Sequence, residues 1–275
     1  MEKHRNRITN FMTTSFAPES RSGAIGCAPS FVGIDGCRGG WLAVRRRSGA
    51  SALAIEVSCV RELTDVLGSN ATAHSGARPR MTAIDMPIGL LDRPQAGGRP
   101  CDTAARSELG GRASSIFSPP SREVLGAKSF EETRGFGLSL QSFHLLPKIR
   151  ELDEWMTPGR QRTLREAHPE LVFRRLAGRS LEHPKRRPEG LRERLAILRA
   201  DGRFGSPRSR RPDMRYLDRI RAETPRPRGV TFARDDLVDA MVLALAAEDI
   251  VAGRAARYPG KPKRDNHGLQ MEIWG

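Results

Sequence analysis

The chain has 275 residues, of which 38% are hydrophobic and 29% charged, and its net charge is +15. Its length suits one large domain. It has no run of about eighteen apolar residues and no apolar secretory signal in the polar, basic segment 1–30, so we expect a cytoplasmic protein outside the membrane. Four cysteines without a Cys-x-x-Cys pair exclude a disulfide framework and a zinc site of that kind. We expect a disordered basic leader over 1–30 and one domain over 31–275.

Short apolar strands open the predicted domain. Gly36–Gly40 predicts a tight turn between the first two strands, and Arg61–Leu67 predicts a helix after the third. A fourth apolar strand lies within Met81–Leu90 and ends in an aspartate, as the first strand does. The first three strands are expected over Phe31–Asp35, Trp41–Arg46 and Ala52–Val60.

Helices dominate the second half of the predicted domain. A fifth strand is expected within Leu164–Glu170, with a helix opening at Pro169. The Arg/Pro-rich segment 203–229 predicts a loop or a partly ordered insertion. The other helices are expected over Cys101–Leu109, Leu138–Trp155, Pro188–Ala200 and Arg234–Gly253.

The last of these helices begins with several carboxylates. Asp236 and Asp239 stand three residues apart, which places both on one face of the first turn. Acidic side chains at this end suit the helix dipole, and Asp235 is the expected N-cap.

This order of elements is typical of a ribonuclease H-like fold, an α/β fold with three antiparallel N-terminal strands, then parallel strands, and helices on the flanks. In that fold the first and fourth strands are neighbours, so Asp35 and Asp85 can converge with aspartates of a helix packed across the sheet. Convergent carboxylates repel one another unless a cation neutralises them, and oxygen ligands suit Mg²⁺ or Mn²⁺. The pattern therefore predicts a two-metal site whose ligands and catalytic residues are Asp35, Asp85, Asp236 and Asp239.

Five further residues have two interpretations each. Glu170 either reaches the metal cluster as a catalytic residue or serves a helix N-terminus. His168 either orients a substrate phosphate or is a structural side chain. Arg99, Arg112 and Arg122 either bind substrate phosphates or hold a long loop by ion pairs.

Basic charge is concentrated in one quarter of the chain. Residues 160–228 contain 21 basic and 9 acidic residues, a net charge of +12. Such a segment attracts polyanions and predicts nucleic acid, DNA or RNA, as the partner. A solvated arginine-rich surface is the alternative interpretation.

Separate segments of the chain also resemble, in order, the motifs of the domain-of-unknown-function family 429, a family of predicted nucleases of ribonuclease H fold. The resemblance implies the same fold and activity. DDLVDA is similar as well to the Asp-x-x-Asp-Ala helix of resolvase-type nucleases, which implies metal-binding roles for Asp236 and Asp239. The segments are GIDGCRGGW (33–41), AIDMPIGL (83–90), RPCDTAARSELGGRASSIFSPPSR (99–122), GLSLQSFHLLPKIRELD (137–153), EAHPELVF (166–173), DDLVDA (235–240) and GLQMEIW (268–274).

The expected function is a metal-dependent nuclease that hydrolyses phosphodiester bonds with Mg²⁺ or Mn²⁺. One alternative is a nucleic-acid-binding module of the same fold without turnover. Another is a phosphotransferase on a small phosphorylated substrate, although the actin-like sugar kinases consist of two such halves and this chain has the length of one. The third is an interaction protein that uses only its basic segment.

Overall fold

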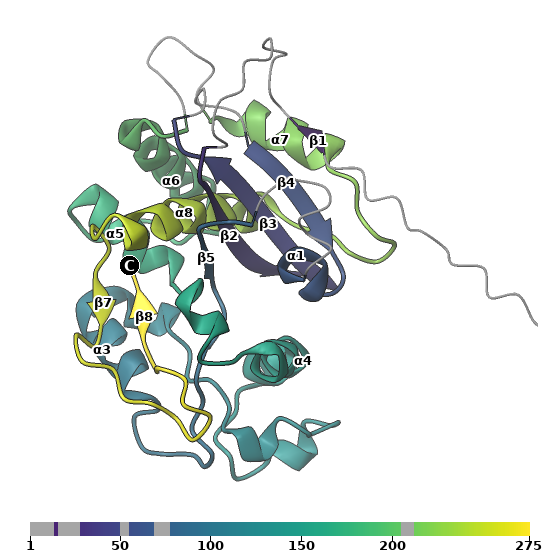
Figure 1. Cartoon of the computed structure of the whole chain (residues 1–275), viewed down its shortest axis with the longest axis vertical. Helices are drawn as coiled ribbons and strands as arrows, with labels where there is room; N and C mark the ends of the chain where they lie inside the picture. The colour runs from purple at the N-terminus through teal and green to yellow at the C-terminus, as the bar shows by residue number, and fades with distance from the viewer. Residues whose placement is uncertain (1–13, 16–27, 50–54, 69–77, 205–211) are drawn as a thin grey trace, which may run out of the picture.

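A six-stranded mixed sheet forms the centre of the computed structural model, which describes residues 14–15, 28–49, 55–68, 78–204 and 212–275 (Figure 1). The strand order is β1-β4-β3-β2-β5-β6. β2, β3 and β4 pair antiparallel, whereas β5 pairs parallel with both β2 and β6. The sheet is therefore mixed, as predicted. The strands are β1 Thr14–Ser15, β2 Ser30–Cys37, β3 Gly40–Arg47, β4 Ile55–Val60, β5 Met81–Ile84 and β6 Leu164–Glu166.

Helices cover both faces of this sheet. α8 lies across β2, β3 and β5 on one face and contacts α5, α6 and α7. On the other face, Ile149 and Leu152 of α4 share a buried cluster with Val32 and Ile34 of β2. The helices are α1 Thr64–Leu67, α3 Pro100–Leu109, α4 Leu140–Trp155, α5 Pro169–Ala177, α6 Pro188–Asp201, α7 Met214–Glu223 and α8 Arg234–Val251.

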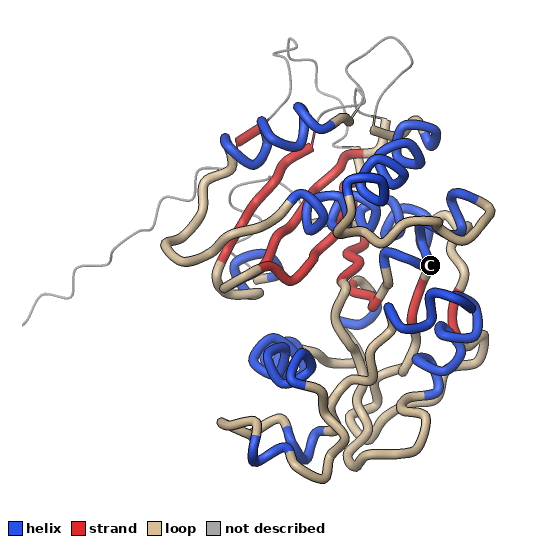
Figure 2. Tube along the Cα trace, turned by 180° about the vertical axis from the view of Figure 1, so that it is seen from behind, coloured by secondary structure: helices blue, strands red, loops and turns tan. Residues whose placement is uncertain are grey.

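Shorter elements complete the fold. β7, Arg257–Tyr258, and β8, Ile273–Trp274, form a separate antiparallel pair that the sequence did not predict. Loops between β5 and α4 lie beside the C-terminal segment at one end of the molecule (Figures 1 and 2). The 3-10 turns are η1 Gly110–Ser115, η2 Arg122–Val124, η3 Glu131–Thr133 and η4 Arg160–Arg162. No helix of the described residues is long and apolar enough to cross a membrane.

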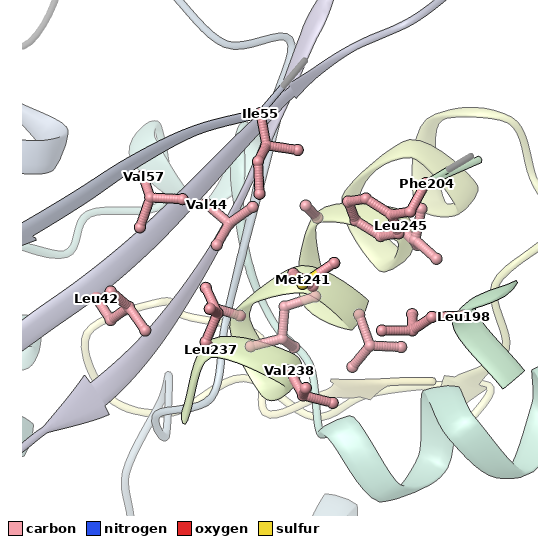
Figure 3. Close-up of a cluster of buried hydrophobic side chains, with 14 of the residues drawn as sticks. Leu42, Val44, Ile55, Val57, Leu198, Phe204, Leu237, Val238, Met241 and Leu245 are labelled. Atoms are coloured by element: carbon pink, nitrogen blue, oxygen red, sulfur yellow. The ribbon is translucent and has the colours of Figure 1, made fainter. Parts of the chain in front are cut away.

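α8 is the central helix of the larger core. Twelve of its 18 residues are buried, which is expected of a helix enclosed on all sides. Leu237 and Met241 pack against the side chains of β3 and β4, while Leu198 of α6 approaches from the opposite side (Figure 3). This packing fixes the N-terminal turn of α8 against the sheet, and that turn carries the aspartates of interest.

Gly33 allows the backbone of α8 to contact the backbone of β2 directly. A Cβ atom on Gly33 would overlap the carbonyl oxygen of Ala240 and the amide nitrogen of Ala244. Because side chains alternate along a strand, Asp35 points to the same face as Gly33, toward α8. The glycine thus positions the helix beside the first aspartate.

Gly33→Ala is expected to lower the free energy of unfolding by about 1–3 kcal/mol, because either the helix or the strand must shift. Urea denaturation measures the change. Gly111→Ala is the matched control, since a Cβ there meets nothing within 4 Å. Equal stabilities of the two variants would contradict the close contact between β2 and α8.

The segment 203–229 is only partly the loop that the sequence predicted. Residues 205–211 lie outside the described residues, but α7 lies within the segment. Asp213 caps this helix by accepting the N–H of Tyr216 at 2.8 Å, and Leu217 and Ile220 join the core. The segment is thus a partly ordered insertion, and its helix was not predicted because the arginines of α7 concealed a narrow apolar face.

Other element boundaries differ by a few residues. β5 ends at Ile84, so Asp85 directly follows the strand that was expected to end in it. Most of the predicted leader, and residues 52–54 of the predicted third strand, lie outside the described residues. Within the leader, Thr14 and Ser15 pair with β4.

Candidate active site

Asp35 of β2 and Asp85, which directly follows β5, occupy neighbouring positions in the sheet. Ile34 is in register with Ile84 in this parallel pair, and the Asp85 N–H donates to the Ile34 carbonyl at 3.0 Å. Asp35 and Asp85 are the next residues after this pair, so their backbones lie side by side, about 5 Å apart across the sheet. The first and fourth strands of the predicted domain are thus neighbours in the sheet.

α8 supplies the other two aspartates. Asp239 is buried, with 1% of its surface exposed. Asp236 accepts the N–H of Ala233 at 2.7 Å and so caps the helix. The prediction that Asp235 is the N-cap was wrong, because the N-cap is Ala233 and Asp235 lies inside the first turn.

Three of the four aspartates have raised pKa values. Burial raises the pKa of Asp35 well above its ordinary value, and the neighbouring charges of Asp85, Asp239 and Asp236 raise it further. Burial also raises the pKa of Asp239, to about 6, although Lys185 opposes the shift. Burial raises the pKa of Asp236 as well. These shifts are the ones expected when carboxylates of like charge gather in one buried place.

Lys185 is the residue of this site that the sequence did not reveal. Its Nζ atom lies 2.6 Å from Oδ2 of Asp239. Burial alone would lower the pKa of Lys185, but Asp239, Asp35 and Asp85 together raise it. The ammonium therefore pairs with Asp239, and its charge also interacts with those of Asp35 and Asp85. In the sequence it stands in the run His183-Pro-Lys-Arg-Arg, where nothing distinguishes it from the arginines that follow.

Glu170 and its partners lie near the start of α5. The Glu170 carboxylate accepts hydrogen bonds from Arg194 and, at 3.2 Å, from Arg112. Its second oxygen is buried without a hydrogen-bond partner among the described residues. Glu170 thus forms ion pairs at a helix N-terminus and still has one oxygen free, so both of its interpretations stay open.

His168 is the N-cap residue of α5 and lies beside Asp85. Its Nε2 atom is 3.2 Å from the Ser115 carbonyl, whereas its buried Nδ1 atom has no partner among the described residues. With Asp85, Arg99 and Glu166 it lines a cavity of about 20 Å³, enough for about one water molecule.

Arg99 is a buried ion-pair centre. Only 2% of its surface is exposed, and its guanidinium lies 2.7 Å from both Asp102 and Glu166. It also donates to the carbonyls of Ile88 and Gly89. This arrangement matches the loop-holding interpretation, because the guanidinium is enclosed by protein.

Arg122 has the same kind of surroundings. It donates to the carboxylates of Asp153 and Asp265 at 2.8 and 2.6 Å and to the Leu90 carbonyl at 3.1 Å. Asp265 in turn accepts from the Leu90 and Leu269 N–H groups. Arg122 therefore ties the loop after β5 to α4 and to the C-terminal segment.

Arg99→Met is expected to lower the free energy of unfolding by about 3–5 kcal/mol, because it leaves the Asp102 and Glu166 carboxylates buried without their cation. Urea denaturation measures the loss. Arg93→Met, at an exposed arginine of the same loop, is the control and is expected to change little. Stability equal to that of the wild type would assign Arg99 to substrate binding instead.

A comparison with protein-family models places these residues in a known family. The model of DUF429, described as a protein of unknown function, matches residues 33–264. The chain belongs to the DUF429 family. All four aspartates, Glu170 and Lys185 of this DUF429 protein fall within the match. Comparisons with curated proteins and with solved structures give no match.

The donor atoms of this DUF429 site suit a hard divalent cation in kind, because they are carboxylate oxygens. Oδ1 of Asp239 is buried without a hydrogen-bond partner among the described residues, and Oδ2 is held by Lys185. In the described part of the chain, no three Asp, Glu, His or Cys side chains form a group that could hold a metal ion. The oxygens are therefore of the kind that such a cation takes, but the described side chains do not form a three-ligand group around one point, and Lys185 holds one of the oxygens.

Proposed function

We propose that this DUF429 protein is a metal-dependent nuclease of ribonuclease H-like fold that hydrolyses phosphodiester bonds of DNA or RNA. The supporting observation is the meeting of Asp35, Asp85 and Asp239 between two parallel strands and the helix across them. Such a concentration of carboxylates, of which Asp35 and Asp239 are buried, is costly for stability unless it serves a cation. The neighbouring positions of β2 and β5 support the fold assignment.

Each acidic residue has a separate role in this proposal. Asp35, Asp85 and Asp239 would hold Mg²⁺ or Mn²⁺, which when bound activates water and stabilises the charge on the leaving oxygen. Asp236 contributes negative charge from the first turn of α8 while it caps the helix. Glu170, held by Arg194 and Arg112, presents its free oxygen from the start of α5.

The proposed substrate class depends on positive charge beside the acidic residues. Lys185 lies in a loop with the exposed Arg186 and Arg187. These three cations provide a contact surface for the phosphates of a nucleic-acid strand. Arg112 is partly exposed and adds a guanidinium near Glu170.

The direct test is a panel of labelled DNA and RNA substrates, single-stranded, duplex, hybrid and branched, incubated with Mg²⁺ or Mn²⁺. The wild type is expected to cleave at least one of them. Asp85→Asn, and the wild type in EDTA, are expected to cleave none. Cleavage that persists in Asp85→Asn would contradict the assignment of the site.

A nucleic-acid-binding module without turnover is the second candidate, and the ion pair between Lys185 and Asp239 favours it, because a fixed ammonium can neutralise a carboxylate without any metal. This candidate requires that substrates bind without being cleaved and that Mg²⁺ does not bind. Measuring the melting temperature as Mg²⁺ is added separates the two candidate functions, since only a protein that binds the ion in its folded state gains stability from it.

A further inference from the structure

We infer that a cavity between β5 and α4 binds one nucleotide, with the phosphate at Arg93 and Arg106 and the base against Phe136. The cavity has a volume of about 410 Å³, within the range of about 300–1,000 Å³ that small-molecule sites occupy. Its lining residues lie between positions 91 and 138, in α3 and the loops at one end of the molecule (Figures 1 and 2). The inference goes beyond the proposed nuclease and does not depend on a metal ion.

The lining of this cavity carries positive charge without a matching negative charge. Arg93, Arg99 and Arg106 line it, and no Asp or Glu is among the described residues that do so. Arg99 pairs with Asp102 and Glu166. Neither Arg93, which is exposed, nor Arg106 forms an ion pair within the described part of the chain. Two guanidiniums without a carboxylate partner favour an anionic ligand.

Neutral groups hold the Arg106 guanidinium in place. Its Nε donates to the Ile116 carbonyl at 3.1 Å, and its two terminal nitrogens donate to the Gly97 carbonyl at 3.2 Å and to Oγ of Ser118 at 2.8 Å. Each terminal nitrogen carries a second N–H, which remains for an anion. The Ser118 hydroxyl accepts from Arg106 and keeps its own O–H as a donor. A fixed guanidinium beside a hydroxyl suits the oxygens of a phosphate.

Phe136 supplies an aromatic surface of the cavity. Its side chain is partly exposed and belongs to none of the hydrophobic clusters of the described residues. Gly135 and Gly137 flank it, and a Cβ on either would meet nothing within 4 Å, so the ring is accessible to a ligand. Aromatic rings bind nucleobases by stacking. Gln95, another lining residue, adds an amide that can donate to and accept from the edge of a base.

The cavity adjoins the carboxylate site. Arg99 lines both this cavity and the smaller one that contains Asp85. Phe117 lines the smaller cavity, and the next residue, Ser118, lines the larger one. A nucleotide in the larger cavity would therefore lie beside the acidic residues. A free nucleotide and the terminal nucleotide of a strand share the chemistry that the cavity recognises.

Isothermal titration of the full chain in EDTA with AMP, GMP, CMP and UMP tests the inference without cleavage or a metal ion. The wild type is expected to bind at least one of them. Arg93→Gln is expected to weaken binding about tenfold, because a hydrogen bond to a charged phosphate is lost. Phe136→Ala is expected to weaken it about tenfold through the loss of stacking. The matched control is Arg134→Gln, at an exposed arginine that does not line the cavity, and it is expected to bind like the wild type.

Inorganic phosphate and the corresponding nucleosides test the two parts of the ligand separately. Each is expected to bind at least about tenfold more weakly than the nucleotide, because each occupies only part of the cavity. Inorganic phosphate that binds as tightly as the nucleotide would overturn the inference. Absence of nucleotide binding to the folded wild type would overturn it too, as would wild-type affinity in both Arg93→Gln and Phe136→Ala.

A dinucleotide with a 5′-phosphate distinguishes the two sources of the ligand. Tighter binding than that of the mononucleotide, weakened in the same two variants, would identify the end of a nucleic-acid strand as the occupant. Equal or weaker binding would identify the free nucleotide, and both results support a nucleotide site. Failure of the inference would leave the proposed nuclease unaffected, because neither variant alters a carboxylate of its site.

Discussion

Asp35→Asn is expected to lower the cleavage rate at saturating substrate by a factor on the order of 10³ or more, because it removes a carboxylate from the centre of the proposed ion site. Single-turnover cleavage with the best substrate of the panel measures the loss. The control is Asp65→Asn, at an exposed aspartate of α1, which is expected to cleave at the wild-type rate. Full activity of Asp35→Asn would place the chemistry elsewhere.

The same variant is expected to be more stable than the wild type in EDTA at pH 8, by about 0.5–2 kcal/mol. The pKa of Asp35 is raised above the ordinary value of 3.8 by burial and by Asp85, so the folded protein holds this proton more tightly than the unfolded chain. The resulting stabilisation is complete below pH 3.8 and is lost as the pH rises through the folded pKa. Asn does not ionise, so its advantage should disappear in acid. Lower stability of Asp35→Asn at pH 8 would make Asp35 a structural hydrogen-bond partner.

The acidic part of the site could be predicted because its geometry follows from local pattern. Alternation along β2 decides which face Asp35 takes, and the parallel register with β5 brings Asp85 to the same level. The three-residue spacing of Asp236 and Asp239 fixes their side of α8. The long-range contacts that these arguments need are the pairing of β2 with β5 and the packing of α8 across the sheet, both of which the order of elements indicates.

Lys185 could not be predicted because its role depends on a tertiary contact. The loop before α6 reaches Asp239 only because Glu193 and Arg194 hold it against α8 and α5, and these bonds join separate segments of the chain. The sequence around Lys185 contains no residue spacing that predicts its contact with Asp239.

The roles of Arg99 and Arg122 could be predicted only in part, for a similar reason. Arg99 is followed three residues later by Asp102, and Asp102 accepts the Arg99 N–H at the start of α3. This capping pattern was readable in the sequence and favours a structural Arg99. Glu166, the second partner of Arg99, comes from β6 and gives no local signal. Arg122 likewise has partners on distant segments, Asp153 and Asp265.

The basic segment 160–228 contains two kinds of arginine, and only one kind is available to a ligand. Arg175 and Arg203 pair with the fully buried Asp249 at 2.6 and 2.8 Å, and Arg194 pairs with Glu170 inside the core. The net charge of +12 therefore overstates the charge that the described surface presents. Arg186, Arg187 and Arg192 remain exposed around the loop that carries Lys185.

Replacing these three exposed arginines with Gln is expected to weaken nucleic-acid binding on the order of 10²-fold at low salt and to reduce the slope of log affinity against log salt by up to about 3, because each removes a phosphate contact. Fluorescence anisotropy over a salt series measures both. The cleavage rate at saturating substrate should stay near that of the wild type.

The matched control replaces two exposed basic residues of another loop, Lys128→Gln and Arg134→Gln, and should leave both affinity and slope close to the wild-type values. The carboxylate variant Asp35→Asn should show the reverse pattern, with binding retained and cleavage lost. If the triple variant binds as well as the wild type at every salt concentration, Arg186, Arg187 and Arg192 are only a solvated surface. The phosphates would then have to be held by Lys185 and Arg112, two partly exposed cations that contact the acidic residues directly.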